Sequence, residues 1–348
     1  MPLLSLIWIT ALGLVAMALA WMSQLIVARL INEWRAGGRA ADRTAVVQGL
    51  MGVLRGAPGA ADALRPYVGR ARLMADALLE FQGLIRGDDQ ERVLAELRDL
   101  GLVRTLADRL NRGSRAGRMT VLEALAALGG PEALAAIRSA ISSSRPEVRM
   151  AALKAMADSG AQPSVGRLID YVVAGEVEPS RLFADLLRQV TAADTPAALL
   201  ALRRHDLTPE MRALLVDALG FSGDYRVLQS LVEAASDSHE EVRTAAVRGL
   251  GRLQHPAGET AIARAMTDPA WIVRSAAAEA AGAAGFSKLV AGLDGLLADP
   301  EWWVRFRAGE ALVAIGADGL SVLRRAAEGE RALASRAAAL AMAEGGVQ

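Results

Sequence analysis

Arginine recurs at an almost constant interval through the last two thirds of the chain. Successive members of the series are 31 residues apart, with a single gap of 32, and they are Arg118, Arg149, Arg181, Arg212, Arg243, Arg274, Arg305 and Arg336. A fixed period near 30 residues is typical of solenoids, in which each repeat is a helical hairpin that packs on its neighbours. The period therefore predicts an all-α solenoid and argues against a compact enzyme domain.

The residues around each arginine follow a helical pattern. An apolar residue usually precedes the arginine, and small or aliphatic residues follow three, six and seven places later, on one helix face. Alanine is frequent on that face, which predicts close approach of neighbouring helices. Glycine, which suits the left-handed residue that ends a helix, usually stands eleven places after the arginine. These glycines are Gly129, Gly160, Gly223, Gly285 and Gly316.

An acidic residue stands six places before the arginine in the C-terminal repeats but not in those of Arg118, Arg149 and Arg181. An aspartate there can cap the next helix and accept hydrogen bonds from an arginine of its own or the adjacent repeat. We therefore expect a structural ladder of Asp206, Arg212, Asp237, Arg243, Asp268, Arg274, Asp299 and Arg305. Its repetition favours a structural role over catalysis, since a reaction needs its catalytic groups only once.

The Asp-x5-Arg spacing, the xPxVRxxAxxAL pattern and the period of 31 resemble HEAT repeats of the short type also found in bilin-lyase-like proteins. The resemblance covers residues 118–346. It implies a right-handed superhelix of antiparallel helix pairs whose concave face binds a partner. The solenoid is expected over residues 111–348.

Residues 2–28 carry no charged side chain. About 20 apolar helical residues suffice to cross a bilayer, so residues 1–28 are predicted to form one transmembrane anchor. Trp8 and Trp21 would lie near its interfaces, and Arg29 and Arg35 would hold the C-terminal side in the cytoplasm. A signal peptide is the alternative, because residues 18–20 resemble a cleavage site, but no basic residue precedes the apolar run.

The anchor and its flanking charges predict a single-pass protein of the bacterial inner membrane, with the N-terminus outside and the HEAT domain in the cytoplasm. Residues 29–110 have irregular helical patterns broken at residues 56–59 and 87–89. A terminal repeat must cover the open apolar end of its stack. We therefore expect these residues to form juxtamembrane helices and an N-terminal cap of the solenoid.

Composition excludes several kinds of site. Lys+Arg and Asp+Glu both number 39, which argues against a nucleic-acid partner. The chain has no cysteine, and its three histidines are scattered, so no metal site is expected. No nucleophile elbow, P-loop or dinucleotide-binding turn occurs, and we predict neither a cofactor nor a catalytic residue.

Three tryptophans form the candidate binding site. Trp271 and Trp302 stand three places before the arginine in consecutive repeats, and Trp303 follows the second. This position lies about 200° around the helix from the buried residue that precedes the arginine, so it faces outward. Exposed indoles on adjacent helices are typical of a docking surface. Packing beneath the preceding turn is the other interpretation.

These features predict a non-enzymatic membrane adaptor that binds a protein partner on its solenoid and packs its anchor helix against a membrane protein. HEAT-type proteins with one N-terminal span resemble accessory subunits of bacterial envelope polysaccharide glycosyltransferases, which gives a finer hypothesis. The alternatives are a bilin lyase or isomerase-like enzyme, implied by the same repeat subtype, and a nucleic-acid-binding HEAT protein. The zero net charge opposes the last of these.

Overall fold

The computed structural model describes residues 40–110, 115–143 and 145–346, together with Met17, Trp21, Met22 and Gln24. Those ranges consist of helices and short connections, without a β-strand. None of their helices combines the length and the apolar character needed to cross a bilayer. The predicted anchor, residues 1–28, lies outside the described residues apart from the four single positions.

The chain divides into two compact bodies, an N-terminal body that ends at Ala140 and a C-terminal body that begins at Ile141. The first continuous helix that the structure describes in the N-terminal body spans residues 40–54. The helices after it are α2 (Ala60–Val68), α3 (Ala71–Gln82), α4 (Asp88–Asp99), α5 (Leu102–Leu110), α6 (Arg115–Leu128) and α7 (Gly130–Ile141). The division falls 30 residues after the boundary expected at residue 110, so the extent of the cap stays a prediction.

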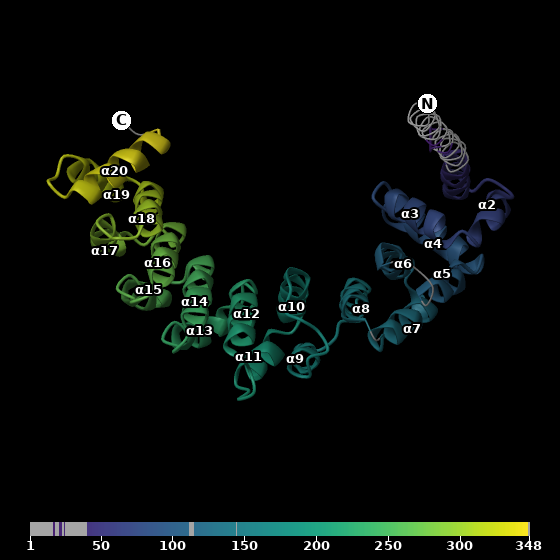
Figure 1. Ribbon diagram of the computed structural model, residues 1–348, viewed down its shortest axis with the longest axis horizontal. Coiled ribbons are helices and arrows are strands. Elements are labelled where there is room, and N and C mark those ends of the chain that lie inside the picture. Colours follow the sequence, from purple (N-terminus) through teal and green to yellow (C-terminus); the bar gives the residue numbers. More distant parts are fainter. Residues whose placement is uncertain are drawn as a thin grey trace, which may run out of the picture. The chain divides into compact units, whose positions relative to one another are not determined.

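The C-terminal body is a stack of helical hairpins in two layers (Figure 1). Helices that carry a repeat arginine form one layer, which we call the arginine layer. They are α8 (Pro146–Asp158), α10 (Arg181–Ala193), α12 (Pro209–Gly220), α14 (Glu240–Leu253), α16 (Trp271–Ala284), α18 (Trp302–Ile315) and α20 (Ala332–Glu344). The second layer consists of α9 (Val165–Val173), α11 (Thr195–Leu202), α13 (Leu228–Ala234), α15 (Glu259–Ala265), α17 (Val290–Leu296) and α19 (Ala317–Ala327).

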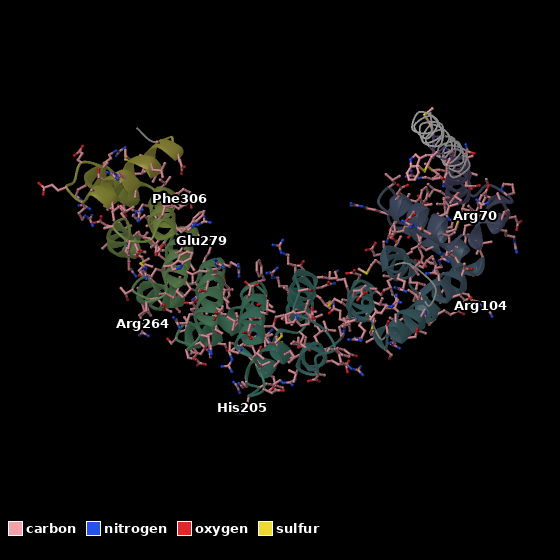
Figure 2. The ribbon with its side chains drawn as sticks, viewed as in Figure 1. Arg70, Arg104, His205, Arg264, Glu279 and Phe306 are labelled. Atoms are coloured by element: carbon pink, nitrogen blue, oxygen red, sulfur yellow. The ribbon has the colours of Figure 1, made fainter. Side chains whose placement is uncertain are left out.

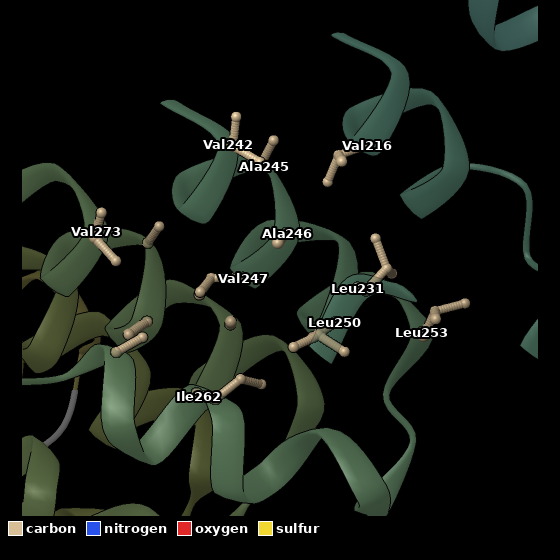
Figure 3. Packing of buried hydrophobic residues seen from close by; sticks show 14 of the residues in the cluster. Val216, Leu231, Val242, Ala245, Ala246, Val247, Leu250, Leu253, Ile262 and Val273 are labelled. Carbon is tan, nitrogen blue, oxygen red and sulfur yellow. The ribbon is translucent and has the colours of Figure 1, made fainter. Parts of the chain in front are cut away.

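The core lies between the two layers and between successive repeats. The apolar residue before the arginine is buried, as the pattern predicted, at Val148, Met211, Val242, Val273 and Val304. Figure 3 shows Val242, Ala246 and Leu250 of α14 among side chains from α13, α15 and α16. Each repeat thus completes its core with residues of its neighbours, which makes the stack cooperative over short distances.

The glycine eleven places after the arginine adopts a positive φ, as predicted, with values between 62° and 89°. A residue with a Cβ is strained in this conformation, which explains the choice of glycine. The repeat of Arg243 is an exception, because Gln254 takes the same place with φ 52°. Its side-chain Nε2 donates a hydrogen bond to the Ala283 carbonyl of the next repeat at 2.7 Å.

Neighbouring helices of the arginine layer approach one another at glycine, as the small residues predicted. A Cβ on Gly251 would lie 2.7 Å from Ala280 Cα, and one on Gly282 would lie 2.7 Å from Ala311 Cα. Gly220 against Gly249 is equally close, since a Cβ on the first would lie 2.6 Å from the Cα of the second. These contacts set the spacing of the repeats and hence the spacing of the side chains on the exposed face.

Candidate functional site

The ladder arginines join one repeat to the next. Arg243 donates from Nε and Nη2 to the two carboxylate oxygens of Asp268, at 2.8 and 2.9 Å. Arg274 holds Asp299 in the same way, at 2.7 and 3.0 Å. The third nitrogen, Nη1, turns back to the preceding loop, where that of Arg274 donates to the Asp268 and Pro269 carbonyls at 2.8 and 3.1 Å. Each guanidinium therefore fixes its own loop and the loop of the next repeat.

The ladder aspartates also order the loops in which they stand. Asp268 Oδ1 accepts a hydrogen bond from the Ala270 N–H, and Asp299 Oδ1 accepts one from the Glu301 N–H, both at 2.9 Å. Burial would raise the pKa of the Asp268 carboxyl, but hydrogen bonds from Arg243 and Ala270 outweigh it, so that pKa lies below its usual value. The hydrogen bond with Asp299 raises the pKa of the Arg274 guanidinium. Both groups are charged at neutral pH.

The structure does not bring every expected member of the ladder to a partner of this kind. Arg212 Nη1 lies 3.4 Å from Asp237 Oδ2, a single and longer contact. Asp206 binds Arg204, two residues away, at 2.9 and 2.6 Å. Within the described residues, Arg305 donates only from Nη1, to the Asp299 and Pro300 carbonyls at 2.7 and 2.8 Å. An arginine therefore binds the aspartate of the next repeat in three successive contacts, and the contact from α18 to α20 has no such pair. The three pairs are Arg212–Asp237, Arg243–Asp268 and Arg274–Asp299.

The three candidate tryptophans are exposed in the structure. The exposed fractions of Trp271, Trp302 and Trp303 are 41%, 47% and 51%. Trp302 lies edge-on to Trp303, with ring centroids 4.6 Å apart, and stacks on Phe306 at 5.1 Å. Phe306 is labelled in Figure 2, where it and Glu279 lie on the side of the arginine layer and His205 and Arg264 lie on the opposite side.

We call Trp302, Trp303 and Phe306 the aromatic cluster. Trp303 also meets Phe306 edge-on, with centroids 6.0 Å apart, so each ring contacts the other two. Phe306 was not among the candidates from the sequence, although its spacing of four from Trp302 places both on one helix face. Mutual stacking holds the rings in position, which lowers the entropy that they would lose on contact with a partner.

A groove of about 560 Å³ runs beside this cluster, between α18 and α20. Trp302 and Phe306 line one wall, together with Val313, and Leu333 and Leu340 line the other. Both leucines are exposed, at 42% and 38% of their surfaces. This volume falls within the range of about 300 to 1,000 Å³ that is usual for binding sites. The sequence patterns did not indicate the groove.

The remaining predicted site residues belong to the anchor. Trp8, Arg29 and Arg35 lie outside the described residues, and Trp21 is described singly, with 68% of its surface exposed. Within the described ranges, no group of three or more His, Cys, Asp or Glu side chains is placed to hold a metal ion. The aromatic cluster and its groove are therefore our candidate site in that part of the chain.

Comparisons with solved structures return matches of low sequence identity. A Kap121p mutant matches with 14% identity and a TM-score of 0.44, over 80% of this chain and 41% of that one. Kap95p, in a structure that concerns its binding to RanGDP, matches with 14% identity and a TM-score of 0.48, over 87% and 49%. Human deoxyhypusine hydroxylase matches with 18% identity and a TM-score of 0.25, over 71% and 98%.

This chain thus spans about two fifths of Kap121p, the first of these structures. A search of curated proteins found no match. The model of the HEAT-repeat family, in contrast, matches three stretches, residues 103–181, 196–263 and 258–343. These stretches cover well over half of the sequence, and they contain the ladder, the aromatic cluster and most of the groove. The chain therefore belongs to the HEAT-repeat family.

Proposed function

We propose that this protein is a non-enzymatic adaptor that binds a protein partner on the exposed face of its arginine layer, at the aromatic cluster and Trp271. The observation that carries the proposal is the exposure of three tryptophans at one end of an otherwise regular stack. Tryptophan is enriched among the residues that dominate protein interfaces, and exposed apolar surface of this kind usually marks such an interface. Most charged groups of the ladder already bind one another and hold the repeats together, as Arg243 and Arg274 bind Asp268 and Asp299.

We further propose that residues 1–28 anchor the adaptor in a bacterial inner membrane, with the solenoid in the cytoplasm. The uncharged apolar run and the arginines that follow it support this topology. A membrane protein that contacts the anchor helix is then a natural second partner, and an envelope polysaccharide glycosyltransferase is the class that the resemblance suggests. The full-length protein should stay in the membrane pellet at alkaline pH and keep its unprocessed mass; release or a mature N-terminus near residue 21 would contradict this.

The binding proposal is tested with a photo-cross-linking amino acid introduced at position 303 of the full-length protein in its native membrane. We expect one predominant cross-linked protein from this position, and none from a matched probe at Arg264, which lies in the second layer. The double change Trp271→Ala and Trp302→Ala should weaken detergent-solubilised capture of the same protein by more than tenfold, because interface tryptophans commonly contribute 2 kcal/mol or more.

The same double variant should unfold at a temperature close to that of the wild type, since both indoles are exposed. A large loss of stability with unchanged capture would show that the tryptophans serve the fold. Equal cross-linking from positions 303 and 264 would refute a localised binding face.

A further inference from the structure

The last ladder arginine has an open carboxylate-binding edge. In Arg243 and Arg274, the Nε–Nη2 edge binds an aspartate of the next repeat with two parallel hydrogen bonds. The same place in the repeat after Arg305 holds Glu330, which is exposed and makes no hydrogen bond to Arg305. Across the described ranges, Nε and Nη2 of Arg305 donate no hydrogen bond, while its Nη1 is fixed by the two loop carbonyls.

Arg305 is one of the residues at the groove between α18 and α20. Arg305 and Arg336 both line it, near the N-terminal ends of the two helices, together with Trp302, Phe306 and Leu333. Arg336 is exposed and has no ion-pair partner among the described side chains. One end of the groove therefore combines two cationic groups with a wall of aromatic and aliphatic surface.

The other end of the groove has the opposite charge. Glu310 and Glu344 line it, farther along the same helices. Glu310 Oε2 already accepts a hydrogen bond from Arg307 Nη1 at 2.8 Å. Glu310 follows Arg305 by five residues, a rise of about 7.5 Å along a helix. The two signs are thus separated along the groove, so an occupant must place its own acidic group near the N-terminal ends of α18 and α20.

We propose that this groove binds a short segment of a protein partner in which an aspartate or glutamate stands beside aliphatic or aromatic residues. The carboxylate takes the Nε–Nη2 edge of Arg305 as an aspartate takes that of Arg274, and the apolar neighbours pack against Phe306 and Leu333. The inference rests on the proposed function and adds the chemistry of the partner. A planar guanidinium that is already oriented loses little entropy when it binds a carboxylate in this bidentate way.

The test starts with selection from a random library of displayed dodecapeptides against the full-length protein in detergent. Peptides that are enriched should carry an acidic residue within one or two places of Leu, Ile, Phe or Trp. The strongest peptide is then synthesised with its acid and with the matching amide, and the affinity of each is measured by fluorescence anisotropy. We expect the amide form to bind about 10- to 100-fold more weakly, as is usual for the loss of a charge-assisted pair.

Three protein variants locate the contact. Arg305→Gln should lower the affinity for the acidic peptide by the same factor and leave the affinity for the amide peptide unchanged. The effects of the two changes are then not additive. Arg336→Gln, which removes no loop contact, should weaken it about two- to fivefold at low salt. Arg264→Gln in α15 is the matched control and should change the affinity less than twofold. Circular dichroism verifies that each variant is folded.

Several results would overturn the inference. One is the enrichment of peptides that lack an acidic residue or contain a basic residue in its place. Another is an equal affinity of the acidic peptide for the wild type and for both groove variants. If such peptides still lose affinity with Trp302→Ala, the aromatic cluster binds partners by another chemistry and the proposed function stands. If no peptide depends on Trp302, Arg305 or Arg336, both proposals fail. Occupation of the groove by a second copy of this chain would appear as a dimer that Arg305→Gln dissociates, and it would replace the peptide partner.

Discussion

A single methyl group added at Gly282 tests whether glycine sets the spacing of the repeats. Gly282 lies in the last turn of α16, against α18, and a Cβ there would lie 2.7 Å from Ala311 Cα and 2.8 Å from Ala311 Cβ. Cβ atoms essentially never come closer than 3.0 Å to another heavy atom. The nearest atom belongs to the backbone, so a change of rotamer cannot relieve the clash. The two helices must move apart.

The magnitude follows from two opposing effects. Overpacking of a close contact costs about 1 to 3 kcal/mol, and the backbone clash favours the upper end of that range. Alanine in place of glycine inside a helix returns about 1 kcal/mol of helix propensity. We therefore expect Gly282→Ala to destabilise the contact by about 2 kcal/mol net. Ala311→Gly should restore only part of the loss, because the Cα of residue 311 remains.

Gly295→Ala is the matched control for this change. Gly295 lies in α17, and a Cβ there would meet no atom within 4 Å. The same methyl group should therefore stabilise the protein by about 0.5 to 1 kcal/mol. The measurement is amide hydrogen exchange of the full-length protein, which resolves individual helices, since a repeat protein need not unfold in a single step. Amides of α16 and α18 should exchange about 30-fold faster in Gly282→Ala. Unchanged or slower exchange in that variant would refute the reasoning.

Three further predictions concern the loops between repeats. Gln254→Gly should raise the free energy of unfolding, measured with urea, by about 0.5 kcal/mol. Glycine relieves the strained positive φ, and this gain exceeds the loss of one exposed hydrogen bond. A lower urea midpoint in the variant would show that the hydrogen bond to Ala283 contributes more. Arg274→Ala should cost about 1.5 to 3 kcal/mol in urea unfolding, whereas Arg307→Ala, in a surface pair, should cost less than about 1 kcal/mol, and equal losses would contradict the ladder geometry. Asp268→Asn should destabilise the protein at pH 7, and by less as pH falls below about 3.9. Folding lowers the pKa of the Asp268 carboxyl, so its contribution is complete above the unfolded value and disappears as pH falls through the folded value. Thermal unfolding against pH measures this, and a destabilisation that stays the same at neutral and acidic pH would contradict it.

The period and the small residues were sufficient to predict the hairpins, the buried apolar residue before five of the arginines and the close helix contacts. Each of these depends on neighbours at fixed offsets along the chain. Gly285 and Gly316 marked helix ends for the same reason, because a positive φ is a local property. Gln254 was not predicted as a helix end, because it is not glycine. Its positive φ is strained, and the packing of the surrounding repeats holds it in place.

The finer geometry of the site depends on how one repeat sits on the next. The spacing of Asp268 from Arg274 left open whether an arginine binds the aspartate of its own repeat or of its neighbour, and the structure has it bind the neighbour's carboxylate and its own loop's carbonyls. Asp206 follows a different rule, because Arg204 is close enough along the chain to compete. The groove requires the relative position of α18 and α20, which no periodic pattern contains.

The ladder has a consequence for how the chain comes to fold. The carboxylate that Arg243 holds lies only 25 residues further along the chain, and Gly251 meets Ala280 after 29. Proteins rich in such local contacts have low contact order and fold rapidly. During synthesis, each hairpin can dock as soon as the next few dozen residues have left the ribosome, so the C-terminal body can assemble from its first hairpin onward while translation continues. Arg305 is the last ladder arginine along the chain, and the groove proposed for the partner is completed only when α20 has packed.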